Sequence, residues 1–399
     1  MSENIFPKTI TDKFSYSFSV DRFGLYAITL MARCRSAKQI GQTGGEDLWV
    51  EIDGRRFREV PEFAKPQYQD IPPAWNGSRL NGLNKTVVFL LLLDPGQHEL
   101  VFISDKGGMV ETEPQLRFIT NYNQIKFNIE QHAEDGDRRP WFTIALIDLP
   151  LKSFSADVTV NYRFRDSDDV KLLVDGKVKK NYLSILRRSW LWLANILTKI
   201  SKEERQKKIF EENLGRGDHY IEFWADRMPI LHEVVLDLGL DKLTRIPSVR
   251  NPKWTGENFR DDSEQMILAR AIFGEARDSR LSDKVRVAVG WTIRNRVEDL
   301  KNRWGKTYHA VILQVKQYSA FNQTNKNRPF VENPLFAGSE IDRKAWFKCY
   351  EIAGQVLNRS ISDPTEGANH YFDDSIGTPS WATKENFVIK IDTISFYRL

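Results

Sequence analysis

Glu275 is the side chain of this sequence best placed for acid–base chemistry. It follows a segment with helical periodicity, in which Leu268, Ala271 and Ile272 form an apolar stripe. Glu275 falls on that stripe, three and four residues after Ile272 and Ala271, so we expect its carboxyl group to face a core or a cleft. Burial without a cationic partner favours the neutral acid and raises its pKa, which a proton-donating catalyst requires.

The pattern alone leaves a structural alternative open. Arg270 and Arg277 lie on the same segment, and either could form an ion pair with Glu275. Glu275 could also sit in a frayed last turn of the helix. In either case the carboxylate would have no catalytic role.

Other catalytic chemistries have weaker support. His232–Leu236 lacks the second histidine of a zinc-protease helix, and the other histidines are scattered along the chain. There is no glycine-rich phosphate loop, and no serine or cysteine nucleophile motif. Cys349 lies on an apolar stripe, which predicts a buried free thiol and, with Cys34 far away, no disulfide. We therefore expect neither a metal nor a cofactor.

The elements around Glu275 form the last part of the chain. Several amphipathic helices are followed by a β-prone tail at 387–391, an α+β pattern that we assign to a domain of residues 261–399. Asp261 or Asp262 could cap the helix that leads to Glu275. Residues 246–260, with two prolines and little periodicity, are predicted to be a linker.

The preceding residues are β-prone and contain an approximate repeat. Asp47–Gly54 is echoed by Asp169–Gly176, and Leu93–Phe102 by Leu214–Phe223. The spacing between the copies is about that of a small β-sandwich. We predict two tandem all-β, jelly-roll-like sandwiches at 1–125 and 126–245, the second with a charged helical insertion near 182–208.

Composition is that of a globular protein, with 41% hydrophobic and 28% charged residues. A formal net charge of +4 without a concentrated basic stripe does not indicate a nucleic-acid binder. The longest apolar run, Ser189–Leu197, is too short to span a bilayer, which takes ~20 residues. Met1–Pro7 is not a basic segment followed by an apolar one, so we expect no signal peptide.

Four motifs follow one another in the last part of the chain. They are Gly-Glu-Ala-Arg at 274–277, Asn-Arg-Val at 295–297, Gln-Tyr-Ser at 317–319, and a group at 363–398 that contains Asn369-His370-Tyr371 and Trp381. Their types and order resemble the SleB/CwlJ-type cell-wall hydrolases, the family of spore cortex-lytic enzymes. Asp278-Ser279 departs from the family's second Gly-Glu pair, and Tyr318 replaces its usual Phe.

The resemblance implies a mostly helical, lysozyme-like domain with Glu275 as the catalytic glutamate. It implies cleavage of peptidoglycan glycan strands at N-acetylmuramic acid linkages by a lytic transglycosylase, in which one carboxylate serves as acid and then as base. A hydrolase would need a second carboxylate. Asp363, Asp373 and Asp374 are available, although their neighbours favour turn positions.

The matched motifs also contain side chains suited to bind a glycan. Amide and hydroxyl groups orient acetamido and hydroxyl groups, and aromatic rings stack on sugars. The alternative for the short polar residues is hydrogen bonding within their own loop. The predicted substrate-binding residues are Gln317, Ser319, Asn322, His370, Tyr371 and Trp381, whereas Arg296 is expected to bind backbone carbonyls or an internal carboxylate.

Two other functions stay open. Some relatives are amidases that cut the stem peptide, although such an enzyme would usually need a metal or a nucleophile. The protein could also be a non-catalytic wall-binding or injection-machine component. Without a signal peptide, a protein acting at the bacterial wall would be released by lysis or by a non-classical export or injection route.

The two predicted sandwiches more weakly resemble carbohydrate-binding modules. Trp75 lies among turn-forming residues and could stack on a sugar, or could equally fill its own loop. The sandwiches could therefore bind a wall or surface polysaccharide, or dock the chain on a delivery apparatus.

Overall fold

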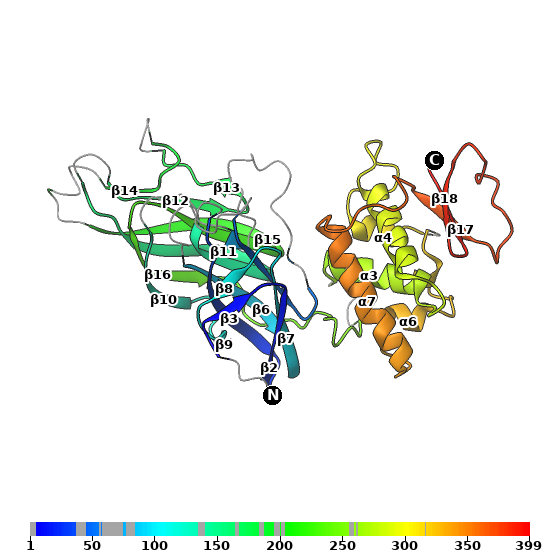
Figure 1. Cartoon of the computed structure of the whole chain (residues 1–399), viewed down its shortest axis with the longest axis horizontal. Coiled ribbons are helices and arrows are strands. Elements are labelled where there is room, and N and C mark those ends of the chain that lie inside the picture. Colours follow the sequence, from blue (N-terminus) through cyan, green and yellow to red (C-terminus); the bar gives the residue numbers. More distant parts are fainter. Residues whose placement is uncertain are drawn as a thin grey trace. The chain divides into compact units, whose positions relative to one another are not determined.

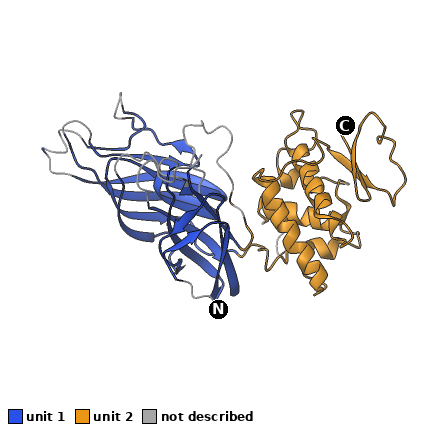
Figure 2. Cartoon of the chain, in the orientation of Figure 1, with its two compact units in different colours: residues 1–52, 58–244 blue, residues 53–57, 245–399 orange. Residues whose placement is uncertain are grey.

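The computed structural model describes residues 5–36, 45–55, 57, 75–76, 84–134, 140–163, 167–182, 187–194, 200, 204–254, 259–260, 262–315 and 317–399. The chain divides into two compact units (Figure 2). Unit 1 comprises Met1–Ile52 and Arg58–Thr244, and unit 2 comprises Asp53–Phe57 and Arg245–Leu399.

Unit 1 is built from strands (Figure 1). One twelve-stranded sheet has the central order β1-β8-β3-β6-β11-β15-β12-β13, and a four-stranded sheet has the order β2-β7-β4-β5. The strands are β1 (Lys8–Ile10), β2 (Lys13–Val20), β3 (Gly24–Arg33), β4 (Asp47–Ile52), β5 (Trp75–Asn76), β6 (Lys85–Leu93), β7 (Gly96–Ile103), β8 (Gly108–Val110), β9 (Gln115–Ile119), β10 (Ile125–His132), β11 (Pro140–Thr159), β12 (Asp169–Val174), β13 (Lys177–Val178), β14 (Trp192–Leu193), β15 (Arg205–Asp226) and β16 (Ile230–Asp237).

The approximate repeat is present in the strand pairing. Ile52 of β4 lies opposite Leu100 of β7, and the equivalent Val174 of β12 lies opposite Ile221 of β15. Both β4 and β12 end in an Asp-Gly turn with positive φ at both residues, 51° and 75° in the first copy and 49° and 72° in the second. The repeated sequences thus encode the same strand pair and the same turn.

The division of this region into two sandwiches is not confirmed. Strand β6 pairs in parallel with β11, from Thr86 opposite Phe142 to Leu90 opposite Leu146. A single hydrogen-bonded sheet therefore continues across the predicted boundary at residue 125, and both parts fall in one compact unit.

The predicted helical insertion near 182–208 agrees with Ile200, which is helical, but is wrong at residues 187–194 and 204–208. Residues 205–208 begin the long strand β15, and Trp192–Leu193 forms β14 beside β12. Exposure alternates along the start of β15, and Phe210 stacks on Phe154 at 4.9 Å. The charged run is therefore the solvated side of a strand whose period of two was missed. Residues 183–186, 195–199 and 201–203 lie outside the described residues.

The predicted sugar-stacking role of Trp75 is also wrong. Trp75 lies in β5 and is only 2% exposed. Its indole nitrogen donates a hydrogen bond to the carbonyl of Lys85 at 2.8 Å. A sugar cannot reach a ring that is buried in this way, so Trp75 fills its own part of unit 1.

Unit 2 combines helices with a three-stranded sheet of order β17-β19-β18 (Figure 1). No helix among the described residues is long and apolar enough to cross a membrane. The elements are α3 (Glu264–Ala276), α4 (Asp283–Val297), α5 (Tyr308–Ile312), the 3-10 turn η1 (Ser319–Phe321), α6 (Arg328–Glu332), α7 (Glu340–Leu357), β17 (His370–Asp373), β18 (Phe387–Ile391) and β19 (Ile394–Tyr397).

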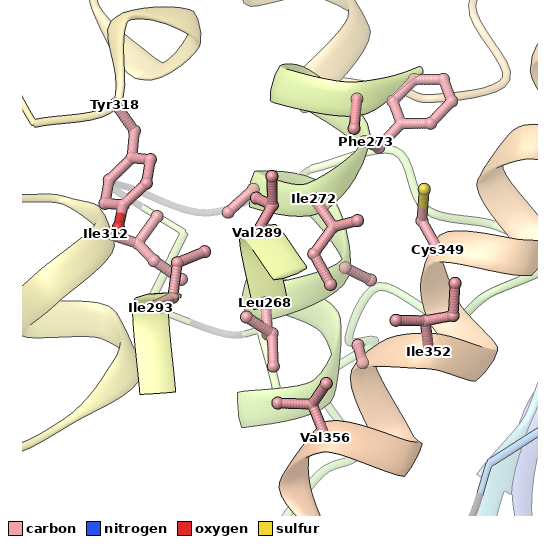
Figure 3. Packing of buried hydrophobic residues seen from close by; sticks show 14 of the residues in the cluster. Leu268, Ile272, Phe273, Val289, Ile293, Ile312, Tyr318, Cys349, Ile352 and Val356 are labelled. Atoms are coloured by element: carbon pink, nitrogen blue, oxygen red, sulfur yellow. The ribbon is translucent and has the colours of Figure 1, made fainter. Parts of the chain in front are cut away.

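Helix α3 lies at the centre of the unit 2 core. Its residues from Gln265 to Phe273 are all buried. The apolar stripe in the sequence predicted one buried face, whereas the helix is buried on all sides over this range. Figure 3 shows Leu268 and Ile272 between side chains of α4 and α7, which include Val289 and Val356. Cys349 of α7 belongs to this core as a buried free thiol, as predicted.

A buried ion pair fixes the start of α3. Arg270 and Asp262 are both fully buried, with Nε 2.7 Å from Oδ2. Arg270 also donates to the carbonyls of Pro252 and Val331 at 2.6 Å. The prediction that Asp262 caps the helix is wrong, because the side chain of Ser263 accepts the bond from the backbone N–H of Met266.

The predicted linker at 246–260 is packed into unit 2 where it is described. Val249 is a core residue whose carbonyl accepts a bond from the Trp346 indole at 2.8 Å. The backbone N–H of Trp254 donates to the carbonyl of Glu332 at 2.8 Å. The prolines of this segment interrupt secondary structure, but the segment still packs against the rest of unit 2.

We expect Arg270→Met to destabilise unit 2 strongly. It would leave the Asp262 carboxylate and several carbonyls buried without this guanidinium, which costs roughly 3–5 kcal/mol for a broken buried pair. Denaturant unfolding of the whole chain measures this free energy. Arg343→Met, at an exposed position of α7, is the matched control and should change it by no more than about 0.5 kcal/mol. Equal effects of the two substitutions would contradict the assignment.

Candidate active site

Glu275 lies at the C-terminal end of α3 and is partly buried. Tyr371 of β17 donates a hydrogen bond from its hydroxyl group to Oε2 of Glu275 at 3.1 Å. Burial raises the pKa of Glu275 to about 7, and the Tyr371 bond and the positive charge of Arg296 only partly oppose the rise. A substantial fraction of this carboxyl group is therefore protonated at neutral pH.

The ion-pair alternative for Glu275 is wrong. Arg270 is bound to Asp262, as described above. Arg277 lies over the ring of Phe330, 3.5 Å from its centroid, and its Nη2 is 3.5 Å from Oδ1 of Asn327. Among the described residues neither arginine pairs with Glu275, which agrees with the prediction of a buried acid without a cationic partner.

Arg286 of α4 holds the end of the helix that carries Glu275. Its Nε donates to the carbonyl of Ala276 at 3.1 Å and its Nη2 to the carbonyl of Asp278 at 3.2 Å. Cations stabilise the carbonyls that a helix leaves unpaired at its C-terminus. This contact fixes the direction in which the last turn of α3 presents the carboxyl group.

Gly274 allows another part of the site to approach Glu275. A Cβ atom on Gly274 would lie 2.9 Å from Cγ1 of Val331 and 3.0 Å from Cβ of Ala320. Such distances require the neighbours to shift. The glycine of the Gly-Glu-Ala-Arg motif therefore brings η1, and with it Tyr318, against the end of α3.

Arg296 connects three of the four sequence motifs. It is only 5% exposed, and its Nε donates to the carbonyl of Asn369 at 2.6 Å. Its Nη1 donates to Oε1 of Gln317 at 2.9 Å and to the hydroxyl of Tyr318 at 3.3 Å. The prediction that it binds backbone carbonyls is confirmed at Asn369.

The neighbouring Asn295 orders the segment that enters β17. Its amide group donates to Oδ2 of Asp363 at 3.0 Å and to the carbonyl of Ala368 at 2.9 Å. The Asn-Arg-Val motif therefore positions Tyr371 from two directions, through Asn295 before the strand and through Arg296 at Asn369.

The polar residues of the Gln-Tyr-Ser segment occupy different positions. Gln317, Ser319 and Asn322 are all exposed. Gln317 is held by Arg296, whereas the backbone N–H of Asn322 donates to the Ser319 carbonyl at 3.0 Å. None of the three has a hydrogen bond to Glu275 among the described contacts. Tyr318, which the sequence marked only as a departure, is buried and close enough for Glu275 to influence the pKa of its hydroxyl.

His370 and Trp381 lie on the other face of β17 from Tyr371. Successive strand residues point to opposite faces, and the ring of His370 lies 5.0 Å from that of Trp381 and 5.8 Å from that of Trp304. Burial, together with the positive charges of Arg296 and Arg303, lowers the pKa of His370 to about 4, so the ring is neutral at pH 7. Trp304 could not be found from the sequence, because it lies outside every motif.

The other candidate acids have structural partners. Asp278 binds Arg280 at 2.6 Å, which lowers its pKa to about 2. Asp373 accepts from the hydroxyl of Thr393 at 2.6 Å, and Asp374 pairs with Lys390 at 2.6 Å.

Asp363 likewise occupies a turn, where it accepts bonds from the backbone of Thr365 and Gly367 at 2.8 Å. Its predicted preference for a turn is confirmed. No group of three or more His, Cys, Asp or Glu side chains that could hold a metal ion occurs in the part of the chain that the structure describes.

Unit 2 contains a cell-wall hydrolase domain. Residues 282–397 match the model of the family described as Cell Wall Hydrolase, and the resemblance inferred from the motifs is confirmed for this unit. The matched range begins after α3, so the role of Glu275 rests on its motif and its geometry.

Two solved structures are similar to part of the chain. One is the catalytic domain of the germination-specific lytic transglycosylase SleB from Bacillus anthracis, with 22% identity over 36% of this chain and 97% of that one and a TM-score of 0.25. The other is the catalytic domain of the SleB protein of Bacillus cereus, with 20% identity, coverage of 40% and 100%, and a TM-score of 0.23. No curated protein matches the chain.

We expect Tyr371→Phe to move the pH dependence of wall cleavage to higher pH. The hydroxyl bond lowers the pKa of Glu275, so its removal raises that pKa and keeps the acid protonated further into the alkaline range. The pH profile of kcat/KM on purified wall material measures the shift. Tyr397→Phe, on the other face of the same sheet, is the control. Identical profiles for both variants and wild type would contradict the contact.

Glu275→Gln should stabilise the protein at alkaline pH. Because the folded state holds this proton up to a pKa of about 7 and the unfolded chain only to about 4.5, the wild type loses stability as pH rises through this window. The neutral amide does not ionise and so avoids this loss. The free energy of unfolding of the variant should gain up to about 3 kcal/mol on that of wild type between pH 4.5 and pH 8, and nearly nothing below pH 4.5. Denaturant unfolding at both values measures the difference, and a pH-independent difference would refute it.

Proposed function

We propose that this protein is a lytic transglycosylase that cleaves peptidoglycan glycan strands at N-acetylmuramic acid linkages, with Glu275 as general acid and then base. The observation that carries the proposal is a partly buried, unpaired carboxyl group, with a pKa of about 7, in a cell-wall hydrolase domain. A general acid is most effective when its pKa lies near the working pH.

The reaction needs two proton transfers at one carboxyl group. Protonated Glu275 gives its proton to the glycosidic oxygen as the bond to the anomeric carbon breaks, which leaves an oxocarbenium-like sugar. The 6-hydroxyl oxygen of the same sugar then attacks the anomeric carbon. Ionised Glu275 accepts the hydroxyl proton, so the acid is restored and a 1,6-anhydro end is formed.

The surroundings of Glu275 favour this route over hydrolysis. Hydrolysis requires a second carboxylate as nucleophile or as base for water. Among the described residues, the groups that oppose the rise in the pKa of Glu275 are Tyr371 and Arg296, and no other carboxylate acts on it. The four candidate acids, Asp278, Asp363, Asp373 and Asp374, are occupied by the partners described above.

Substrate binding is assigned to two groups of side chains within this proposal. Gln317, Ser319 and Asn322 are exposed and can orient acetamido and hydroxyl groups, while Tyr371 contacts the acid itself. His370 and Trp381, on the opposite face of β17, would contact a part of the glycan farther from the cleaved linkage. Unit 1 would dock the chain on the wall or on a delivery apparatus.

The proposal is tested by mass spectrometry of fragments released from purified peptidoglycan. We expect anhydro ends, lighter by one water than reducing ends, from wild type and at least 1,000-fold slower release by Glu275→Gln. Glu340→Gln, at an exposed position of α7, is the matched control and should match wild type.

Three other results would contradict the proposal. Reducing ends would identify a hydrolase. Free stem peptides would identify an amidase. Release of no fragments while the protein still sediments with the wall would identify a binding protein.

A further inference from the structure

A hollow of about 660 Å³ lies in unit 2 beside η1. It is bordered by α5, by η1 and by the segment around Phe259–Arg260. Its size falls in the range of cavities that enclose small molecules or short peptide segments. The proposed transfer of protons at Glu275 makes no use of it.

The lining of the hollow is cationic. Arg260, Arg328 and His309 line it, and no Asp or Glu is among the described residues that do so. Arg260 is exposed and makes no ion pair among the described residues. Arg328 is held in place by Glu332 at 2.6 Å and by the carbonyl of Phe321. Arg260 therefore presents a positive charge to the hollow, with no Asp or Glu among the lining residues that the structure describes.

His309 adds an unsatisfied polar atom to the same lining. Its Nε2 is buried and has no hydrogen-bond partner among the described residues. Buried polar atoms in native proteins almost always have a partner, and an exception calls for a cause such as strain, a functional role, or a bound water or ion. Asn322 and Gln323 provide amide donors and acceptors at the same hollow.

The hollow adjoins the end of α3 that carries the acid. Tyr318 lines it, while the hydroxyl of Tyr318 accepts a bond from Arg296 in the field of Glu275. Ala320 of η1 packs directly against Gly274, which precedes Glu275. Tyr318 therefore connects the lining of the hollow with the surroundings of the Glu275 carboxyl group.

We propose that this hollow binds carboxylate groups of the stem peptide attached to the N-acetylmuramic acid beside the cleaved linkage. The inference rests on the proposed function, because it assumes a glycan strand at Glu275. The sugars of such a strand are neutral, whereas the stem peptide carries carboxylates close to the chain. Guanidinium groups bind carboxylates through paired, charge-assisted hydrogen bonds. The protein is then selective for strands whose stem peptides carry free carboxylates.

The test compares peptide-bearing glycan strands with the same strands whose stem-peptide carboxyl groups have been converted to amides by a carbodiimide and methylamine. Wild type should cleave the unmodified strands with a kcat/KM about tenfold to a hundredfold higher, as expected for lost charged hydrogen bonds. Arg260→Gln should remove most of this preference and leave cleavage of the amidated strands unchanged. Arg343→Gln, which removes the same charge from an exposed position of α7, should keep the preference.

Two outcomes would overturn the proposal: equal cleavage of both strands by wild type, or an equal loss on both strands in Arg260→Gln. Calorimetry of a soluble disaccharide-peptide with the Glu275→Gln protein measures binding without cleavage. It therefore distinguishes failure of this inference from failure of the proposed function. Binding that weakens at least tenfold in Glu275→Gln/Arg260→Gln supports the hollow even where no strand is cut. Binding unchanged by Arg260→Gln, or no binding, would refute it.

Discussion

The buried guanidinium group of Arg296 is the interaction on which the active site depends. It connects the Asn369 carbonyl, at the start of β17, with Gln317 and Tyr318 before η1. These segments are far apart in the sequence and have no common secondary structure. A planar group with five donors can bind all of them at once, and its burial makes each lost partner costly.

The same charge limits how far burial raises the pKa of Glu275. Burial favours the neutral carboxyl group, while Arg296 and the hydroxyl of Tyr371 favour the ionised one. Burial has the largest effect because neither opposing group is a direct ion-pair partner. A guanidinium group bound directly to Glu275 would keep it ionised and remove its use as an acid. The arginines adjacent in sequence, Arg270 and Arg277, are bound elsewhere in the fold.

Much of the site could be predicted from the sequence because its signals are local. The orientation of Glu275 follows from helical spacing, and the turn position of Asp363 follows from its neighbours. The strand repeat was visible because Asp-Gly turns require the same positive φ in both copies. Each of these inferences uses residues only a few positions apart.

The remaining features depend on contacts that no local pattern encodes. Arg296 meets partners 21 to 73 residues away, and Trp304 joins His370 only through the fold. Two roles stayed open for Trp75 because burial by distant strands cannot be predicted from its turn-forming neighbours. The charged start of β15 has the composition of a solvated helix, and the alternating exposure that marks it as a strand comes from its pairing with distant strands. Ser263 displaced Asp262 as the cap because Asp262 is needed by Arg270.

The most direct test of the account is the titration of the Glu275 side chain itself. Carbon-13 NMR of the carboxyl carbon, assigned by its absence in Glu275→Gln, gives the midpoint of this group alone. The account predicts a midpoint of about 7, with the exposed glutamates titrating near 4.5. A midpoint near 4.5 for Glu275 would show an ionised carboxylate at neutral pH and would contradict its role as the proton donor.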